Sequence, residues 1–440
     1  MSQRHADSED KTDTLASRAA ALTLLTGAVR EGKSVDKRFQ KITGKLEPRD
    51  RAFVRHLVAT TLRRLGQIDA VLKTFTTRTP PAQVEDILRL GAAQILFLET
   101  APHAAVDTSV GMVRRVRQPR LTGLTNAVLR KVVSKGQDII ADQNWPRLNT
   151  PGWLWDGWTK AYSETTAHRI GEAHLAGAPL DLTVKDPASA EAWAADLDAE
   201  LLSTGTLRRT TSGLVQELPG FADGAWWVQD AAAALPARIL INALDSQANR
   251  RVADLCSAPG GKTLQLVAGG CDVTSLDSSE VRLARVQENL DRTSLKADVV
   301  HADVMQWTPP KPFDAVLLDA PCSATGTLRR HPDLGYLKKR RDVVSYPETQ
   351  RSLLKRAAEF LAPGGVLVYA VCSLEPEEGQ GVVDALLKTS KLSRVPIDPA
   401  PLGIDPNWID GAGALRTLPY YWQKRGGLDG FYAALLKKNA

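Results

Sequence analysis

Cysteine is scarce in this sequence, with four residues in 440. The four stand at positions 256, 271, 322 and 372, without a CxxC pair or a nearby histidine cluster. A disulfide framework is typical of shorter chains with more cysteines, and a zinc site needs ligands at short spacing. We therefore expect free thiols in a reducing compartment and no bound metal.

Long apolar runs are also missing. The longest uncharged apolar-rich run, residues 361–374, is shorter than the about 20 residues that cross a bilayer, and it contains a Pro-Gly-Gly sequence. The first thirteen residues are polar and carry no apolar core of a signal peptide. The sequence thus predicts no membrane segment, and the expected location is the cytoplasm.

Positive charge is concentrated at the beginning of the chain. Residues 1–140 contain 24 Lys and Arg against 14 Asp and Glu, whereas the other 300 residues contain 32 and 36. A basic segment beside a nearly neutral one favours a polyanionic partner, although a solvated basic surface has the same composition. The strongest candidates for phosphate contacts are Arg114, Arg115, Arg117, Arg120, Arg130, Lys131 and Lys135.

The apolar pattern divides the first half of the chain into three parts. Residues 1–14 are expected to form a disordered tail, and residues 15–139 have the helical periodicity of an all-α domain. Residues 140–225 predict a small α+β connector, with strands at 179–185 and 214–218 and a helix at 190–205. Four of the ten tryptophans fall within 145–158, and we expect core packing there rather than base stacking.

Residues 226–440 alternate short β-rich runs with helical segments, which predicts an α/β domain with a mostly parallel sheet. Such sheets bind ligands at the carboxyl ends of their strands. The predicted strands are 251–255, 272–277, 297–303, 313–321 and 365–373, and the clearest helices are 278–292 and 347–361.

The segment DLCSAPGGKT at 254–263 follows the first of these strands and is a candidate nucleoside-binding turn. Gly260 and Gly261 allow the backbone to approach a ligand closely, and a helix N-terminus follows. The segment matches neither the GxGxxG pattern of dinucleotide sites nor the GxxxxGK[ST] pattern of nucleoside-triphosphate loops.

Acidic residues follow the same edge of the predicted sheet. Asp277 stands 23 residues after Asp254, a distance typical of an acid that accepts hydrogen bonds from ribose hydroxyls. We expect its side chain at an exposed strand end and not in the core. Asp303 ends the third strand and is placed to reach an adenine edge. An aspartate at a strand end is also a common helix cap, so each position has a structural alternative.

Two cysteines stand at the ends of separate strands, in DAPCSATGT at 319–327 and in YAVCS at 369–373. A buried cysteine is usually an inert apolar residue, which is what we expect of Cys256 and Cys271. Cys322 and Cys372 instead fall at the edge where ligands bind, and they are candidates for chemistry.

The segments DLCSAPGGKT, LDAPCSATG and YAVCSLEPEEG together resemble the RNA 5-methylcytosine methyltransferases of the family that contains the Sun/RsmB rRNA enzymes and the Nop2 proteins. GFYAALLKK at 430–438 is similar to the last strand of that family, and residues 15–139 resemble the NusB-like RNA-binding domain of its bacterial 16S rRNA member. The resemblance implies a Rossmann-like methyltransferase domain at 226–440, preceded by the NusB-like domain and the connector.

The resemblance also implies the activity, a monomeric S-adenosylmethionine-dependent RNA (cytosine-5)-methyltransferase that acts on 16S rRNA. Cys372 would attack carbon-6 of cytosine, Cys322 would assist the elimination, and Asp319 would contact the base. A neighbouring cation such as Lys262 would favour the Cys372 thiolate. The residues implied to hold the cofactor are Cys256, Ser257, Ala258, Pro259, Gly260, Gly261, Lys262, Asp277, Asp303 and Asp319.

The sequence leaves two alternatives open. DNA cytosine methyltransferases use the Pro-Cys position as the nucleophile, so a DNA enzyme is the first, and a non-enzymatic RNA-binding or antitermination factor is the second. A target base has to be reached outside its stack, which implies a loop or a flipped cytosine. Basic residues that follow Cys322 are candidates to guide the RNA backbone: Arg329, Arg330, His331, Lys338, Lys339, Arg340 and Arg341.

Overall fold

Apolar residues at helical spacing and alternating β-rich runs fold into two separate compact units. The computed structural model describes residues 2–211, 213–244 and 250–439, with side chains from residue 15 onward. The first unit contains the chain up to Leu175 and the segment Arg330–Lys339. The second contains Ala176–Arg329 and the chain from Arg340 onward.

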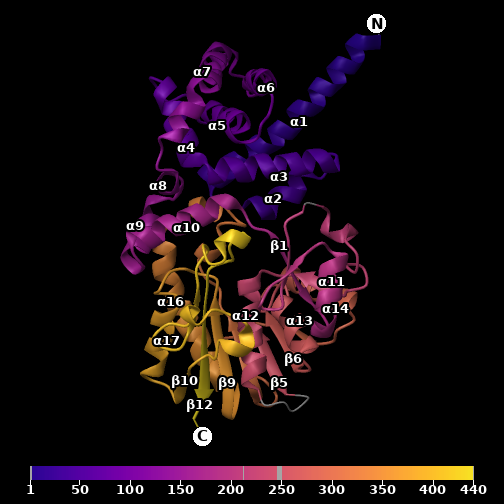
Figure 1. The fold of residues 1–440 in the computed structure, drawn as a ribbon, viewed down its shortest axis with the longest axis vertical. Helices are drawn as coiled ribbons and strands as arrows, with labels where there is room; N and C mark the ends of the chain where they lie inside the picture. Colours follow the sequence, from indigo (N-terminus) through magenta and orange to yellow (C-terminus); the bar gives the residue numbers. More distant parts are fainter. Residues whose placement is uncertain (1, 212, 245–249, 440) are drawn as a thin grey trace. The chain divides into compact units, whose positions relative to one another are not determined.

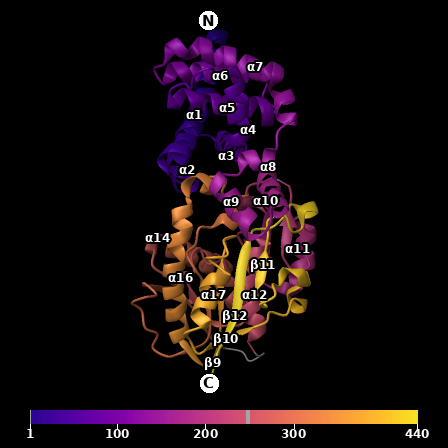
Figure 2. The ribbon, with the colours of Figure 1, turned by 90° about the vertical axis from the view of Figure 1, so that its left-hand side faces the viewer.

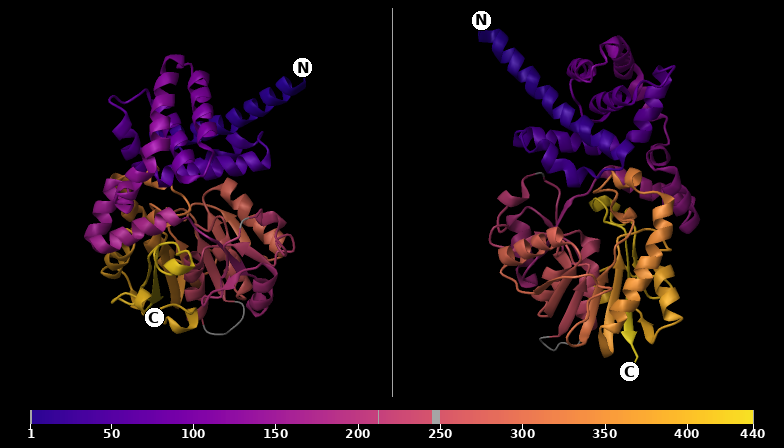
Figure 3. Two further views of the ribbon diagram at one scale, coloured as in Figure 1. Left: turned by 45° about the horizontal axis from the view of Figure 1, so that its top comes forward. Right: turned by 180° about the vertical axis from the view of Figure 1, so that it is seen from behind.

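The first unit is helical, as predicted for residues 15–139 (Figures 1 and 3). Leu25, Leu57, Leu88 and Val128 come from four different helices and are buried in one core, which is the reason for their helical spacing. The helices are α1 Ser2–Glu31, α2 Val35–Thr43, α3 Pro48–Arg63, α4 Leu65–Phe75, α5 Ala82–Phe97, α6 Pro102–Arg115, α7 Thr122–Ala141, α8 Trp145–Asn149, α9 Gly152–Ala161, α10 Glu164–Ala176 and α15 Leu334–Leu337.

Two boundaries differ from the prediction. Helix α1 begins at Ser2, so residues 2–14 are helical and not an irregular tail. This segment contains neither proline nor glycine, and nothing in it interrupts the helix that continues into the apolar residues. The predicted connector 140–225 is also divided, because residues 140–175 belong to the first unit. Trp155 and Trp158 are buried there, in agreement with the expected core packing.

The segment Arg330–Lys339 packs within the first unit although it follows a strand of the second. The backbone N–H of Val35 donates to the Asp333 carboxylate at 2.9 Å. The indole N–H of Trp153 donates to the carbonyl of Gly335 at 3.4 Å. The chain after Cys322 thus contributes to the helical unit.

The second unit begins with a four-stranded antiparallel sheet in the order β2-β3-β1-β4. The predicted strand at 179–185 is present, but the predicted helix at 190–205 stops early, because Asp198 adopts a left-handed φ of 50°. Residues 215–217 form a 3-10 turn, since Trp226–Val228 pairs with β1 instead. The elements are β1 Leu180–Val184, α11 Ala190–Asp196, β2 Glu200–Leu201, β3 Leu207–Arg209 and β4 Trp226–Val228.

The larger sheet of the second unit has the order β10-β12-β9-β8-β5-β6-β7, with β11 beside β12. Strands β5 to β9 are parallel, as predicted, and β12 pairs with β9 in the antiparallel direction. The elements are α12 Ala231–Ala243, β5 Arg251–Leu255, α13 Gly261–Ala268, β6 Asp272–Asp277, α14 Glu280–Thr293, β7 Asp298–His301, β8 Phe313–Asp319, α16 Arg340–Glu359, β9 Leu361–Val371, α17 Gln380–Leu387, β10 Leu392–Val395, β11 Leu415–Thr417 and β12 Phe431–Lys438.

Both faces of this sheet are covered, so its central strands are apolar on both sides. Val252 of β5 packs in the core formed with α12, and the next residue, Ala253, packs in the core formed with α16 and α17. Figure 2 shows α16 and α17 on one side of the sheet and α12 on the other. Only the ends of the central strands are therefore open to a ligand.

Candidate active site

The strand order places a topological switch point between β5 and β8. The chain passes from β5 to β6 and β7 in one direction, then returns to β8 on the other side of β5 and continues to β9. Ligands of open parallel sheets bind where the order reverses, beyond the carboxyl ends of the strands. The loop 256–261 after β5 and Asp319 at the end of β8 flank this point.

The loop 256–261 is held by its own backbone and by the next strand. The Ser257 N–H donates to the carbonyl of Leu276 at 3.1 Å, and the Gly260 N–H donates to the carbonyl of Ser257 at 2.9 Å. Gly260 has a left-handed φ of 101°, and a Cβ there would come within 3.1 Å of Val286. A glycine is required at this position, as the motif indicated.

Asp277 fastens this loop to β6. Its carboxylate accepts the N–H of Ala258 at 3.2 Å, the N–H of Ser279 at 2.9 Å and the guanidinium of Arg282 at 2.7 Å. The side chain is 1% exposed, so the open strand end assumed for a ribose ligand is wrong: the loop and the first turn of α14 close over it. Four acceptor positions minus three hydrogen bonds leave one for a ligand hydroxyl.

The other two aspartates of the predicted series differ from one another. Asp254 is buried, and its Oδ2 accepts the Thr263 hydroxyl at 2.6 Å. Burial raises the pKa of Asp254 to about 7. Asp303 is exposed two residues beyond β7 and accepts the N–H of Met305 at 2.9 Å, which closes a turn and does not cap a helix. The Asp303 side chain therefore remains accessible to a ligand. The buried Asp254 instead stabilises the end of the motif through its hydrogen bond with Thr263.

Lys262 and Asp319 form an ion pair across the switch point. Lys262 Nζ lies 2.7 Å from Asp319 Oδ2 and 5.4 Å from the centre of the Phe431 ring. Burial alone would lower the pKa of Lys262, but the charges of Asp319, Asp254 and Cys372 outweigh it and raise the pKa. Lys262 is thus held as a cation beside the second cysteine. The Asp319 side chain is 29% exposed and remains accessible.

The two cysteines meet at the ends of β8 and β9. Cys322 Sγ lies 3.5 Å from Cys372 Sγ. The N–H of Gly326 donates to the carbonyl of Cys372 at 3.0 Å, and the N–H of Gly430 donates to Gly326 at 2.8 Å. A Cβ on Gly326 would come within 2.0 Å of the Gly430 carbonyl oxygen, so the glycine of DAPCSATGT lets the Cys322 loop approach the start of β12.

The environments of the four thiols differ. The hydrogen bond with Cys372, burial and the nearby charges of Cys372, Glu378 and Asp319 hold the pKa of Cys322 well above its ordinary value. Burial raises the pKa of Cys256, to about 12, and that of Cys271. This agrees with the expectation that Cys256 and Cys271 are chemically inert.

A buried polar cluster behind the cysteines was missed by the sequence analysis. Glu378 accepts hydrogen bonds from Ser323, Ser373 and Gln350, which come from three different elements. The only signal in the sequence was the acidic run EPEEG directly after YAVCSL. Such a run is usually a solvated surface, and its burial depends on contacts that the sequence does not reveal.

The basic residues after Cys322 are not all available to RNA. Arg329 is 0% exposed and is paired with Asp230 and with Asp429, the latter at 2.6 Å, so its assignment as an RNA guide is wrong. His331 Nδ1 lies 2.8 Å from the Asp36 carboxylate within the first unit. Arg340 lies 2.5 Å from Glu377. The positions of these basic residues in the sequence do not show which side chains are buried in ion pairs and which are exposed to RNA.

The basic residues of the first unit are better placed for phosphate. All seven predicted contacts are exposed, and none forms an ion pair within the part of the chain that the structure describes. We call them the α6–α7 basic cluster: Arg114, Arg115, Arg117, Arg120, Arg130, Lys131 and Lys135.

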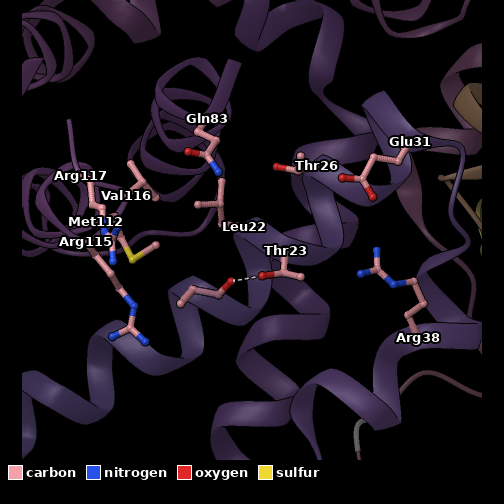
Figure 4. Close-up of a pocket in the computed structure, with 11 residues that line it drawn as sticks. Leu22, Thr23, Thr26, Glu31, Arg38, Gln83, Met112, Arg115, Val116 and Arg117 are labelled. Atoms are coloured by element: carbon pink, nitrogen blue, oxygen red, sulfur yellow. Dashed lines mark hydrogen bonds between the residues drawn. The ribbon is translucent and has the colours of Figure 1, made fainter. Parts of the chain in front are cut away.

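A cavity of about 550 Å³ lies beside this cluster (Figure 4). Figure 4 shows Arg115 and Arg117 on one side of it and Arg38, near Glu31, on the other. One guanidinium nitrogen of Arg38 is buried without a hydrogen-bond partner among the described residues. The cavity thus adds a cation with unused donors to the basic surface.

Among the described residues, no three His, Cys, Asp or Glu side chains gather as a metal site. The described helices include none with the length and apolarity needed to cross a membrane.

Comparison with known proteins gives the family. Residues 241–437 match the family described as 16S rRNA methyltransferase RsmB/F, and residues 15–134 match the NusB family. The ribosomal RNA small subunit methyltransferase B of Vibrio cholerae is 34% identical over 96% of this chain and 97% of its own.

Two solved structures agree. The crystal structure of PH0851 has a TM-score of 0.73 at 21% identity, over 95% of this chain and 98% of that one, which shows the fold. A methyltransferase homologue from Pyrococcus horikoshii has a TM-score of 0.52 at 26% identity, over 64% of this chain and 93% of that one. The resemblance drawn from the three motifs is confirmed, and the chain belongs to the RsmB/F family of 16S rRNA methyltransferases.

Proposed function

We propose that this protein transfers a methyl group from S-adenosylmethionine to carbon-5 of a cytosine in small-subunit ribosomal RNA, through a covalent bond to Cys372. The observation that carries the proposal is the 3.5 Å between the Cys322 and Cys372 sulfur atoms, beside the Lys262–Asp319 ion pair. The cytoplasm is the expected place because the relative from Vibrio cholerae is named for ribosomal RNA. In this proposal the protein acts as a monomer.

The residues at the switch point fit S-adenosylmethionine by their chemistry. The molecule offers ribose hydroxyl, amino and ammonium donors, and the edge offers acceptors on Asp277, Asp303 and Asp319. Gly260 allows the left-handed turn that brings the loop 256–261 to the N-terminus of α13, where backbone N–H groups point toward a ligand. When bound, S-adenosylmethionine supplies an electrophilic methyl group.

Cys372 supplies the activation that cytosine needs. Carbon-5 of cytosine is a poor nucleophile, and attack of a thiolate on carbon-6 converts the ring to an enamine that accepts a methyl group at carbon-5. Lys262 is the cation that interacts electrostatically with Cys372. Asp319 keeps accessible surface, and a carboxyl there can hold the proton at ring nitrogen-3.

Cys322 serves the second half of the reaction. The carbon-5 proton has to leave, the 5,6 double bond re-forms, and the Cys372 sulfur departs with the electron pair of its bond to carbon-6. Cys322 lies 3.5 Å from that sulfur, and its raised pKa keeps it protonated while Cys372 attacks. Before elimination it gives its own proton to solvent, and the resulting thiolate is a strong acceptor for the carbon-5 proton. We assign the assistance of elimination to Cys322.

The α6–α7 basic cluster supplies RNA affinity in this proposal. Its seven exposed cations are not neutralised by described acids, which is the condition for release of counterions from a polyanion. A cytosine has to reach the thiol outside a stack, so a single-stranded loop or a flipped base is the expected substrate.

The test is methyl transfer by the full-length protein from labelled S-adenosylmethionine to small-subunit RNA, followed by mapping of 5-methylcytosine. Label in one cytosine position, absent with Cys372→Ala, supports the proposal. Transfer to DNA of the same sequence but not to RNA would favour the DNA alternative. RNA binding without any transfer would favour a non-enzymatic factor.

A further inference from the structure

Glu378 is a buried acid without a nearby cation. Its side chain is 0% exposed, and no Lys, Arg or His of the described residues lies within ion-pair distance of it. An isolated buried carboxylate costs several kcal/mol unless hydrogen bonds replace its hydration. A position that only filled the core would be more stable with an apolar residue. The presence of this carboxylate therefore requires another explanation.

All acceptor positions of Glu378 are used by hydrogen-bond donors. Oε2 accepts the backbone N–H of Ser323 at 2.8 Å and the amide of Gln350 at 3.0 Å. Oε1 accepts the hydroxyl of Ser373 at 2.9 Å and, in a short contact, the hydroxyl of Ser323. The backbone carbonyl of Glu378 accepts the hydroxyl of Tyr369 at 2.6 Å. Four donors on one carboxylate fix its position closely.

These donors are the neighbours of the two cysteines. Ser323 directly follows Cys322, and Ser373 directly follows Cys372. Gln350, on α16, also donates to the carbonyl of Pro321 at 2.9 Å, so both residues that flank Cys322 are held. One side chain thus connects the ends of β8 and β9 with α16.

We propose that Glu378 is a positioning residue, which holds Cys322 and Cys372 at reacting distance through Ser323, Ser373 and Gln350. This inference rests on the covalent mechanism proposed above. Glu378 forms no contact with substrate or cofactor atoms in it and acts only through the cysteine loops.

The charge of Glu378 is one of several effects that act on Cys322. Together with the hydrogen bond to Cys372, burial and the charge of Asp319, it keeps the pKa of Cys322 raised. The groups that interact electrostatically with Cys322 are Cys372, Glu378, Asp319 and Tyr369. A protonated Cys322 cannot compete with Cys372 for carbon-6, so the charge favours a single nucleophile.

Glu378→Gln separates this role from simple packing, because the side chain keeps its shape. The amide has only one oxygen, so its nitrogen replaces an acceptor either of the Ser323 N–H and the Gln350 amide or of the two serine hydroxyls, and that part of the network has to rearrange. We expect full-length Glu378→Gln to bind S-adenosylmethionine as the wild type does. Single-turnover methyl transfer should be about a hundredfold slower, because a displacement of about 1 Å at a reacting group has an effect of that size.

The pH profile provides a readout that packing would not change. Loss of the negative charge lowers the pKa of Cys322, so the limb of the rate profile that depends on Cys322 should move to lower pH. Glu378→Asp keeps the charge but shortens the reach, and it should be slow with the pH profile of the wild type. Glu377→Gln is the matched control, since Glu377 is an exposed neighbour, and it should leave rate and profile unchanged.

Wild-type rate and an unshifted profile in folded Glu378→Gln would overturn the inference while leaving the covalent mechanism intact. If Glu378→Gln does not fold, Ser323→Ala is the alternative variant, because it removes one hydroxyl donor to Glu378 and little side-chain volume. A slower rate is then expected, and an unchanged rate would overturn the inference. An active Cys372→Ala, in contrast, would show that the proposed function itself has failed.

Discussion

Cys322 and Cys372 are fifty residues apart in the chain, and their sulfur atoms lie 3.5 Å apart at the ends of neighbouring parallel strands. The register of β8 and β9 pairs Asp319 with Ala370, so each cysteine follows its strand by a short, fixed step. Core packing alone does not explain two thiols at that distance on separate loops, so the side chains that hold and surround them decide the properties of the site.

Asp277→Ala should weaken S-adenosylmethionine binding by about ten- to a hundredfold, the effect of losing a charge-assisted hydrogen bond. The melting temperature should also fall, because Asp277 holds the Ala258 N–H and is buried. The control is Arg282→Ala, which breaks the ion pair with Asp277. Because Arg282 is 56% exposed, this variant should change the affinity for S-adenosylmethionine by less than about fivefold. Calorimetry of the Asp277 and Arg282 variants measures the two affinities. Equal dissociation constants for Asp277→Ala and wild type would leave Asp277 as a cap only.

Asp254→Asn should stabilise the protein at pH 8 in the absence of ligand. Burial raises the pKa of Asp254 from 3.8 to about 7, so the folded state binds a proton that the unfolded state releases between these values. The protonated, stable form is present below pH 4, and that stability is lost as the pH rises through about 7.

The asparagine is neutral throughout and keeps an acceptor for the Thr263 hydroxyl. The gain at pH 8 should be on the order of a few kcal/mol, should shrink as the pH falls below about 7 and should disappear below about pH 4. Urea unfolding at both pH values measures it, with exposed Asp298→Asn as the control. A gain that is absent at pH 8, or the same at pH 5, would show that Asp254 is not the titrating group.

Replacement of Arg114, Arg115, Arg117 and Arg120 by alanine should weaken RNA binding without affecting S-adenosylmethionine binding. The plot of log affinity against log salt concentration should become less steep, by roughly 0.7 for each lost contact with single-stranded RNA. Anisotropy titrations at several salt concentrations measure this. Lys73→Ala with Arg78→Ala is the matched control, since both are exposed in the same unit but outside the cluster.

An unchanged salt dependence in the fourfold variant would place the RNA elsewhere. Deletion of residues 1–140 is a poorer experiment, because it also removes the residues on which Arg330–Lys339 packs, such as Val35. A loss of activity after that deletion would not distinguish RNA affinity from damage to the chain that follows Cys322.

The sequence predicted the parallel sheet and the position of the cysteines because both depend on local patterns. Short runs such as RVADL are apolar on both faces, and the residues that end each strand then fall at one edge. The glycine of DAPCSATGT was visible as a motif, but its reason, the approach to Gly430, required the fold.

The errors concern residues whose environment is set by distant parts of the chain. Arg329 is paired with Asp230 and Asp429, each about a hundred residues away, and no local pattern marks its burial. Asp277 was placed at the correct strand end but with the wrong exposure, because α14 closes over it. Glu378 was not singled out from the sequence, because its role depends on the contacts with Ser323 and Ser373 that only the fold shows.

The central claim is that Cys372 attacks the base and Cys322 releases it, and covalent trapping tests this most directly. Full-length Cys322→Ala, incubated with S-adenosylmethionine and labelled small-subunit RNA, should complete attack and methyl transfer but stall before elimination. A slow band should then appear on a denaturing gel and vanish on RNase treatment. Cys372→Ala and the double variant should give no band. A band from Cys372→Ala instead would reverse the two roles, and no band from any variant would contradict the covalent mechanism.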